Sequence, residues 1–403
     1  MSAATPETLG AIDPARAARL AVPALVVWLV LHLPSVCVPH LEIDEHVYRA
    51  LARSLARGDG YTTRGTSIHA TLEPSMYDRP LFHHPPLGPV LLIPFARDPS
   101  RGVVVGWLGH LLVILAVLDL ARRRLPETLA GERALALGLV LAATDPLLVF
   151  AGNKIWLDAP VAGLSALGIA LFDRWLATRA PSAWWGSAAL CALALWTKLT
   201  AFLASGAILA LALGALARAR DGRERLAIAR ATVVWGGLVA LAIFPWLWTF
   251  HETYGVWIPS WVRPSAALIE TNHHIQVVIA LPHHHFLASE TAAIHPAIVA
   301  ACALVLVART RPTALVALAW LIGTLGGLVL LATTGHSSQL RFATIATPPI
   351  HLAAALALAG LGARRPRLAL GLGLALVAHA LVLDAIVVAQ PRMSILGAWW
   401  RYL

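Results

Sequence analysis

Two adjacent carboxylates, Asp44 and Glu45, directly follow the first long apolar run of the chain. A carboxylate held at a membrane surface can act as a general base toward a hydroxyl group. Neighbouring side chains on a helix point about 100° apart, so these two are not expected to share one proton. Arg49 stands four residues after Glu45 and favours an ion pair there, whereas Tyr48 occupies the matching position for Asp44. Taken alone, the pair is explained better as the solvated start of a helix. As a site, it leaves one carboxylate to face the reaction while the other pairs elsewhere, with Asp44, Glu45 and Tyr48 as the residues concerned.

A lysine and an aspartate, Lys154 and Asp158, stand four residues apart between two later apolar runs. If this segment is helical, the two side chains lie one turn apart and can form an ion pair. Asp158 can instead cap the helix that follows, because Pro160 is favoured near a helix start. Both interpretations stay open, and the segment taken alone favours capping.

Two histidines, His83 and His84, stand directly before Pro85 and Pro86. The prolines prevent a helix from running back through the histidines. The apolar stretch that follows, residues 86–96, is too short to span a membrane, so we expect it to lie at the interface or to re-enter. Imidazoles held there can bind a phosphate or a metal.

More histidines occur between residues 251 and 291, namely His273, His274 and His283 to His285. Such side chains can ligate zinc, with His83 as a further candidate ligand. Adjacent histidines converge poorly on one ion, however, and a polar loop needs no metal. We therefore expect no cofactor and assign no metal ligand, with a divalent ion as the open alternative.

The composition determines which elements must position these residues. Apolar residues make up 58% of the chain and charged residues 13%, and the mean hydropathy is +0.72. Soluble domains are about half apolar and a quarter charged. Apolar runs of roughly 20 residues, the length of a bilayer crossing, recur from end to end. This predicts an all-α polytopic transmembrane bundle that forms a single domain over residues 1–403. The predicted spans, about eleven, are 21–39, 102–121, 134–150, 159–176, 183–197, 199–217, 231–250, 292–308, 314–332, 343–362 and 369–388.

The net charge of +10 is carried by arginines in short turns between the apolar runs. This is the positive-inside pattern, and it predicts an N-terminus inside and a C-terminus outside. A nucleic-acid partner is excluded, because it would require a basic stripe on one soluble face. Two long polar segments then face outward: residues 40–101, with interfacial helices, and residues 251–291. The arginine clusters are Arg16 and Arg19, Arg122 to Arg124, Arg174 and Arg179, Arg218 to Arg230, Arg309 and Arg311, and Arg364 to Arg367.

Only two lysines occur, Lys154 and Lys198, and this topology places both at outer helix ends. The positive-inside preference does not account for cations on that side. An anionic ligand accounts for them, and a phosphate is a good candidate.

Taken in order along the chain, these motifs resemble the type C glycosyltransferases of the protein O-mannosyltransferase and aminoarabinose-transferase kind. The resemblance covers most of the chain and depends on short motifs. The motifs are Asp44–Glu45 after the first span, Pro85–Leu87, Asp158–Pro160, Trp196–Lys198, and Arg341–Phe342 through Pro348–Pro349.

The resemblance implies a membrane enzyme that moves a sugar from a polyprenyl phosphate to an acceptor hydroxyl on the non-cytoplasmic face of a bacterial plasma membrane. It makes Asp44 the base that deprotonates the acceptor hydroxyl, and Asp158 a second carboxylate in the site. It implies inversion at the anomeric carbon of the sugar. It places Lys198 and Arg341 near the lipid phosphate; the alternative is that both cations snorkel to lipid headgroups. Relatives often carry an acidic–basic pair where this chain has His83 and His84. The acceptor, whether glycan, lipid or protein, is left open.

A transporter or flippase of a lipid-linked sugar is the alternative. Transporters tend to contain broken helices, ionisable residues at the membrane midplane and inverted repeats. The ionisable residues of this chain are expected at helix ends and in the outer segments, and no repeat is visible, which favours an enzyme.

Overall fold

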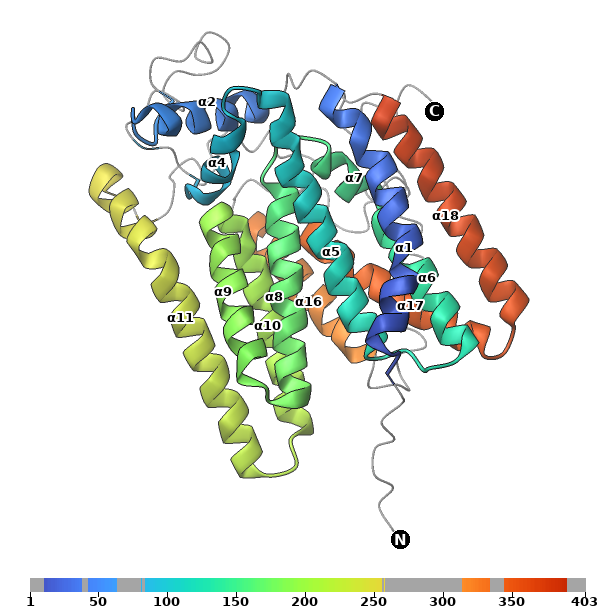
Figure 1. Ribbon diagram of the computed structural model, residues 1–403. Helices are drawn as coiled ribbons and strands as arrows, with labels where there is room; N and C mark the ends of the chain where they lie inside the picture. The colour runs from blue at the N-terminus through green and yellow to red at the C-terminus, as the bar shows by residue number, and fades with distance from the viewer. Residues whose placement is uncertain are drawn as a thin grey trace.

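The computed structural model describes residues 11–37, 43–63, 81, 84–255, 257, 314–333 and 344–389. Within these ranges the secondary structure is helical, apart from one isolated bridge between Ala11 and Pro126 (Figure 1). The predicted all-α class is therefore confirmed.

Long helices make the body of the bundle, and short ones lie at one of its ends. The long helices are α1 (Pro14–His32), α5 (Val104–Arg122), α6 (Leu129–Ala143), α8 (Asp158–Thr178), α9 (Pro181–Thr197), α10 (Phe202–Arg218), α11 (Gly222–Tyr254), α16 (Ala314–Thr333), α17 (Thr347–Gly362) and α18 (Pro366–Ala389). The others are α2 (Ile43–Arg57), α4 (Leu87–Leu92), α7 (Pro146–Gly152) and the 3₁₀ helices η1 (Leu33–Cys37), η3 (Ile93–Phe95), η4 (Pro99–Val103) and η5 (Leu199–Ala201).

Capping side chains and glycine mark the helix boundaries. Asp13 precedes Pro14 and accepts a hydrogen bond from the Arg16 amide at 3.0 Å, which begins α1. Asp221 accepts one from the Glu224 amide at 2.8 Å and begins α11. Helix α11 ends at Tyr254, and the next residue, Gly255, has a φ of 69°, which suits a residue without a side chain.

Seven described helices are long and apolar enough to cross a membrane, or eight if the bent pair α6–α7 counts as one span. Every predicted span except 292–308 overlaps a described helix, and 292–308 lies outside the described residues. The chain is thus a multi-pass membrane protein, while the count of eleven stays a prediction. The predicted boundary near residue 198 is confirmed, because α9 ends at Thr197 and η5 begins at Leu199.

The span predicted over 134–150 is not one straight helix, because the chain bends there by 47° between α6 and α7. Asp145 accepts hydrogen bonds from the Leu147 and Leu148 amides, both at 3.0 Å, and so caps a new helix. Pro146 has no N–H to continue the ladder of α6. Hydropathy averaged over the segment does not register such a break.

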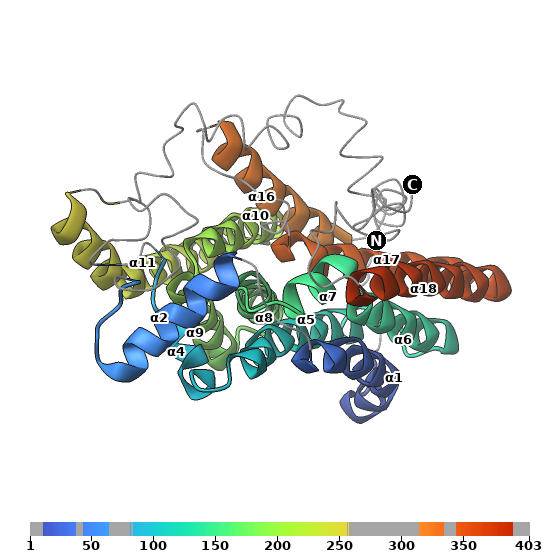
Figure 2. The ribbon, with the colours of Figure 1, turned by 90° about the horizontal axis from the view of Figure 1, so that it is seen from above.

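Helices α5 and α8 lie in the middle of the bundle, with α11 at one edge and α18 at the other (Figures 1 and 2). Gly109 and Gly163 let α5 and α8 meet backbone to backbone: a Cβ on Gly163 would lie 2.1 Å from the Gly109 carbonyl oxygen. Small residues commonly permit such close packing between membrane helices. This contact holds the start of α8, where Asp158 lies, in a fixed position.

Ion pairs gather the arginine-rich turns at one end of the bundle, which we call the arginine end. Arg123 and Arg124 bind Asp173 at 2.8 and 2.5 Å, and Arg174 binds Asp119, which joins α5 to α8. Two further pairs are Arg16–Glu132 at 2.8 Å and Arg179–Glu224 at 3.0 Å. The opposite end, across which α2 lies, is called the α2 end (Figure 1). Charge patterning thus predicted correctly that these arginine-rich turns lie together.

Which end faces the cytoplasm is tested by cysteine labelling. In a variant without Cys37 and the other two native cysteines, Asp59→Cys at the α2 end should react with an impermeant thiol reagent in intact cells. Arg223→Cys, at the start of α11, should react only after the cells are permeabilised. Labelling of the Arg223→Cys variant alone in intact cells would overturn the predicted orientation.

Candidate functional site

Helix α2 is attached to the turn between α7 and α8 through Glu45. The Glu45 side chain is fully buried, and its Oε1 accepts a hydrogen bond from the Ile155 amide at 2.9 Å. Asp44, its neighbour on the first turn of α2, is only half-buried. The pKa of Arg49 is lowered, because burial and the nearby Arg53 outweigh the opposite effect of the Glu45 carboxylate. The two acids thus have different surroundings, as their directions on a helix predicted, but the bond from Glu45 to the backbone was not predicted.

The second predicted pair, Lys154 and Asp158, does not lie on one helix. Residues 153–155 form a turn, and Asp158 is the first residue of α8. The N-cap position belongs to Leu157, and the described helix start has no side-chain capping bond, so the capping interpretation is wrong.

Asp158 pairs with Lys198, which lies far from it in the sequence. The Lys198 Nζ donates to Asp158 Oδ1 at 2.9 Å, and each side chain is only 2% exposed. Lys198 has an extended backbone between α9 and η5, with φ −161° and ψ 136°. Removing two charges from water is costly unless they are paired with good geometry. The snorkelling alternative is therefore wrong for Lys198, because its ammonium group is held inside the protein.

Lys154 is also buried, on the same turn. Its side chain is 3% exposed, and Nζ lies over the Phe150 ring, 5.4 Å from the centroid. Trp156 packs edge-on against the same ring, with centroids 5.3 Å apart. Both lysines of the chain therefore have buried side chains at the α2 end.

Apolar packing brings the remaining described site residues to this end. Tyr48 is buried in a cluster with Leu51, Leu92 and Ile155 that joins α2 to α4 and the turn. Its ring lies 6.1 Å from that of His84. The Tyr61 hydroxyl donates to the Pro85 carbonyl oxygen at 3.2 Å.

His83, Arg341 and the histidines of residues 273–285 lie outside the described residues. Within the described part of the chain, no group of three or more His, Cys, Asp or Glu side chains is arranged to hold a metal ion.

Sequence reasoning missed a network of hydrogen bonds next to the turn at residues 153–155. His32 Nδ1 lies 2.5 Å from Asn153 Oδ1, and its Nε2 lies 2.8 Å from His110 Nδ1. The side-chain nitrogen of Asn153, Nδ2, donates to the Leu31 carbonyl oxygen at 3.1 Å. The turn that carries Lys154 is thereby held against the end of α1. The signal for this network is the occurrence of His32 and His110 in apolar runs, where a polar side chain needs a partner.

More ionisable side chains lie near the break between α6 and α7. His351 Nε2 lies 2.8 Å from Asp145 Oδ2, and Asp384 of α18 is fully buried. The expectation that ionisable residues collect at helix ends is therefore incomplete. His110 Nε2 likewise lies 2.8 Å from the Ala142 carbonyl oxygen, whereas His379 is exposed in the middle of α18.

These features define a class of protein: a multi-pass helical membrane protein with the fold of the type C glycosyltransferases. The solved structures that share the fold are of ArnT from Cupriavidus metallidurans, an aminoarabinose transferase. The apo structure matches with a TM-score of 0.55 and 21% identity, over 95% of this chain and 67% of that one. The structure bound to undecaprenyl phosphate matches with a TM-score of 0.50 and 20% identity, over 94% and 73%.

No protein-family model matches the chain, and no curated protein matches its sequence. At this level of identity, the likeness to ArnT establishes the fold. The family fold that the short motifs implied is thereby confirmed, while the roles of individual residues remain predictions.

Proposed function

We propose that the chain is a membrane glycosyltransferase that moves a sugar from a polyprenyl phosphate to an acceptor hydroxyl. The observation that carries the proposal is the buried Lys198–Asp158 pair, which lies at the same end of the bundle as Asp44. The shared fold adds support, because ArnT has been solved with undecaprenyl phosphate bound. On the predicted topology, this end faces the non-cytoplasmic side.

In the proposed reaction, the Asp44 carboxylate removes the proton of the acceptor hydroxyl as its oxygen attacks the anomeric carbon. The bond from that carbon to the phosphate oxygen breaks, and polyprenyl phosphate leaves with the bonding electron pair. A direct displacement of this kind inverts the anomeric centre. Preorganised cations in a dry site stabilise the charge that develops on the phosphate. Lys198 has this role, with Lys154 and Arg341 as its proposed partners.

The buried carboxylates Asp158 and Glu45 hold Lys198 and Asp44 in position. Asp158 holds the Lys198 ammonium in position, and Glu45 holds α2, and with it Asp44, against the turn before α8. Tyr48, His83 and His84 are proposed to bind the substrate where α2 meets the segment before α4. In this arrangement Asp44 is the proton acceptor, whereas Glu45 positions it.

One observation favours the transporter alternative, namely a bent span with ionisable side chains buried beside it. Helix α6 breaks at Asp145, next to His351. Yet His110 and His351 lie one to two turns from the α2 end of their helices, near the candidate site. A transport pathway would place such groups at the midplane of the membrane. The enzyme therefore remains the better proposal.

The test is incubation of the purified protein, in nanodiscs, with a panel of polyprenyl-phosphate sugars and candidate acceptors. We expect release of polyprenyl phosphate and a glycosylated product from at least one donor. Nucleotide sugars are the matched control and should give no product. Movement of the intact donor across a liposome membrane, without release of polyprenyl phosphate, would establish the transporter instead.

A further inference from the structure

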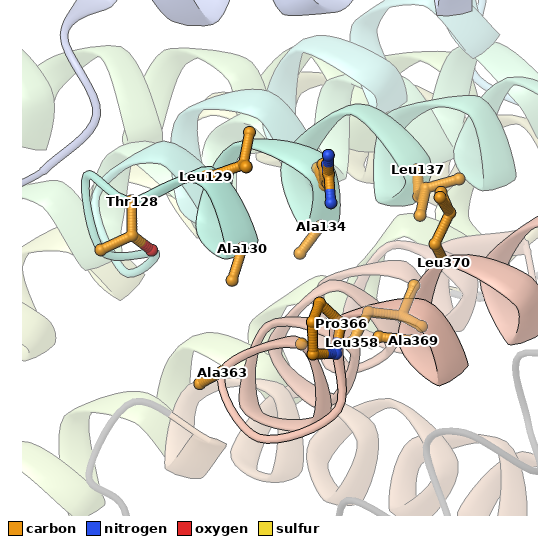
Figure 3. A pocket seen from close by; sticks show the side chains of 12 residues that line it. Thr128, Leu129, Ala130, Ala134, Leu137, Leu358, Ala363, Pro366, Ala369 and Leu370 are labelled. Atoms are coloured by element: carbon orange, nitrogen blue, oxygen red, sulfur yellow. The ribbon is translucent and has the colours of Figure 1, made fainter.

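A cavity of about 380 Å³ lies at the arginine end, between the start of α6 and the turn that joins α17 to α18. Figure 3 shows Ala130 and Ala134 of α6 facing Pro366 and Ala369 across it. The candidate functional site is at the other end of the bundle and shares no residue with this lining. The cavity is thus a separate feature that the proposed function does not use.

The wall of the cavity is almost entirely apolar. Its side chains include Leu137, Leu358 and Leu370, and the charged member of the lining is Arg133. Leu129 is 61% exposed and Leu370 37%, so the rim continues into the apolar outer surface of the bundle. In a membrane, that surface contacts acyl chains. The lining therefore suits a hydrocarbon chain that enters from the lipid.

Positive charge surrounds the same cavity. Arg133 is exposed on α6, and Arg364, Arg365 and Arg367 are exposed on the turn beside it. Among the described residues, none of these four arginines forms an ion pair. The nearby carboxylates are Glu127, just before α6, and Glu132 of α6, and Glu132 is already paired with Arg16 at 2.8 Å. The excess of cations at this rim matches a ligand with an anionic head.

We infer that this cavity binds an anionic phospholipid from the leaflet at the arginine end. One acyl chain lies against the leucines and alanines, and the phosphate contacts Arg133 and the arginines of the α17–α18 turn. Arginine side chains bind phosphate oxygens through two parallel hydrogen bonds. The inference is independent of the proposed transfer reaction, since it depends on the cavity and on the charges around it.

The experiment is native mass spectrometry of the whole protein in detergent, titrated with phosphatidylglycerol or phosphatidylethanolamine of the same acyl chains. The first phosphatidylglycerol should bind at least about fivefold more tightly than the first phosphatidylethanolamine, the effect of roughly one arginine near an anionic headgroup. In the Arg133→Gln variant, the affinity for phosphatidylglycerol should fall by about the same factor. Ala130→Leu, which places a larger side chain in the cavity, should weaken binding of both lipids.

Matched controls lie at the same end, outside the cavity. Arg223→Gln changes an exposed arginine at the start of α11, and Ala217→Leu changes an exposed alanine near the end of α10. Both should bind phosphatidylglycerol like the unmodified protein. Equal affinity for the two lipids would overturn the inference. So would equal losses from the variants at Arg133 and Arg223, because they would indicate general attraction to surface charge.

Discussion

Replacing Asp44 by asparagine is expected to reduce the rate of sugar transfer by about a hundredfold or more, the usual scale for loss of a general base. Asparagine keeps the shape of the side chain and removes its basicity. Asp44 is half-buried on the first turn of α2, so the variant should fold normally. The measurement is the rate of polyprenyl phosphate release with a saturating donor, together with a thermal unfolding curve.

Glu45→Gln is the matched control, one position along the same helix. A glutamine retains an oxygen that can accept from the Ile155 amide, so its expected cost is about fivefold or less. If Asp44→Asn retained the activity of the unmodified protein, Asp44 would not be the base. If Glu45→Gln lost as much as Asp44→Asn, the two carboxylates would not have the separate roles proposed here.

Replacing Lys198 by methionine is expected to affect both stability and donor binding. Asp158 would keep a buried charge without its cation, and breaking a buried pair in this way typically costs about 3–5 kcal/mol. Donor affinity should fall by roughly tenfold to a hundredfold, the worth of one charge-assisted hydrogen bond to a phosphate. The two effects are measured separately, by thermal unfolding and by donor titration of the folded protein.

The double variant Lys198→Met, Asp158→Asn separates structure from binding. It removes both charges, so much of the lost stability should return. The loss of donor affinity should remain, because the cation is still absent. Donor affinity restored together with stability would reduce the pair to a structural role. Arg341→Gln should weaken donor binding in the same way as Lys198→Met.

Local physical chemistry made much of this fold predictable. Apolar runs of membrane-spanning length and short arginine clusters depend only on nearby residues, and they predicted the helices of the bundle and the turns gathered at the arginine end. The motifs at Asp44, Lys154 and Asp158 likewise predicted that potential site residues lie at the other end. These properties are local because every backbone polar group in a membrane helix is satisfied within its own helix.

The pairing of side chains was decided only by the tertiary structure. Asp158 and Lys198 are 40 residues apart in sequence, and Glu45 and Ile155 are 110 apart. Nothing near Asp158 in the sequence indicates that Lys198 is a partner. The extended backbone at Lys198 and the packing of α8 between α5 and α9 bring the two side chains together. A buried charge must find its partner wherever the fold places one, so its pairing follows from the packing of the helices and not from sequence spacing.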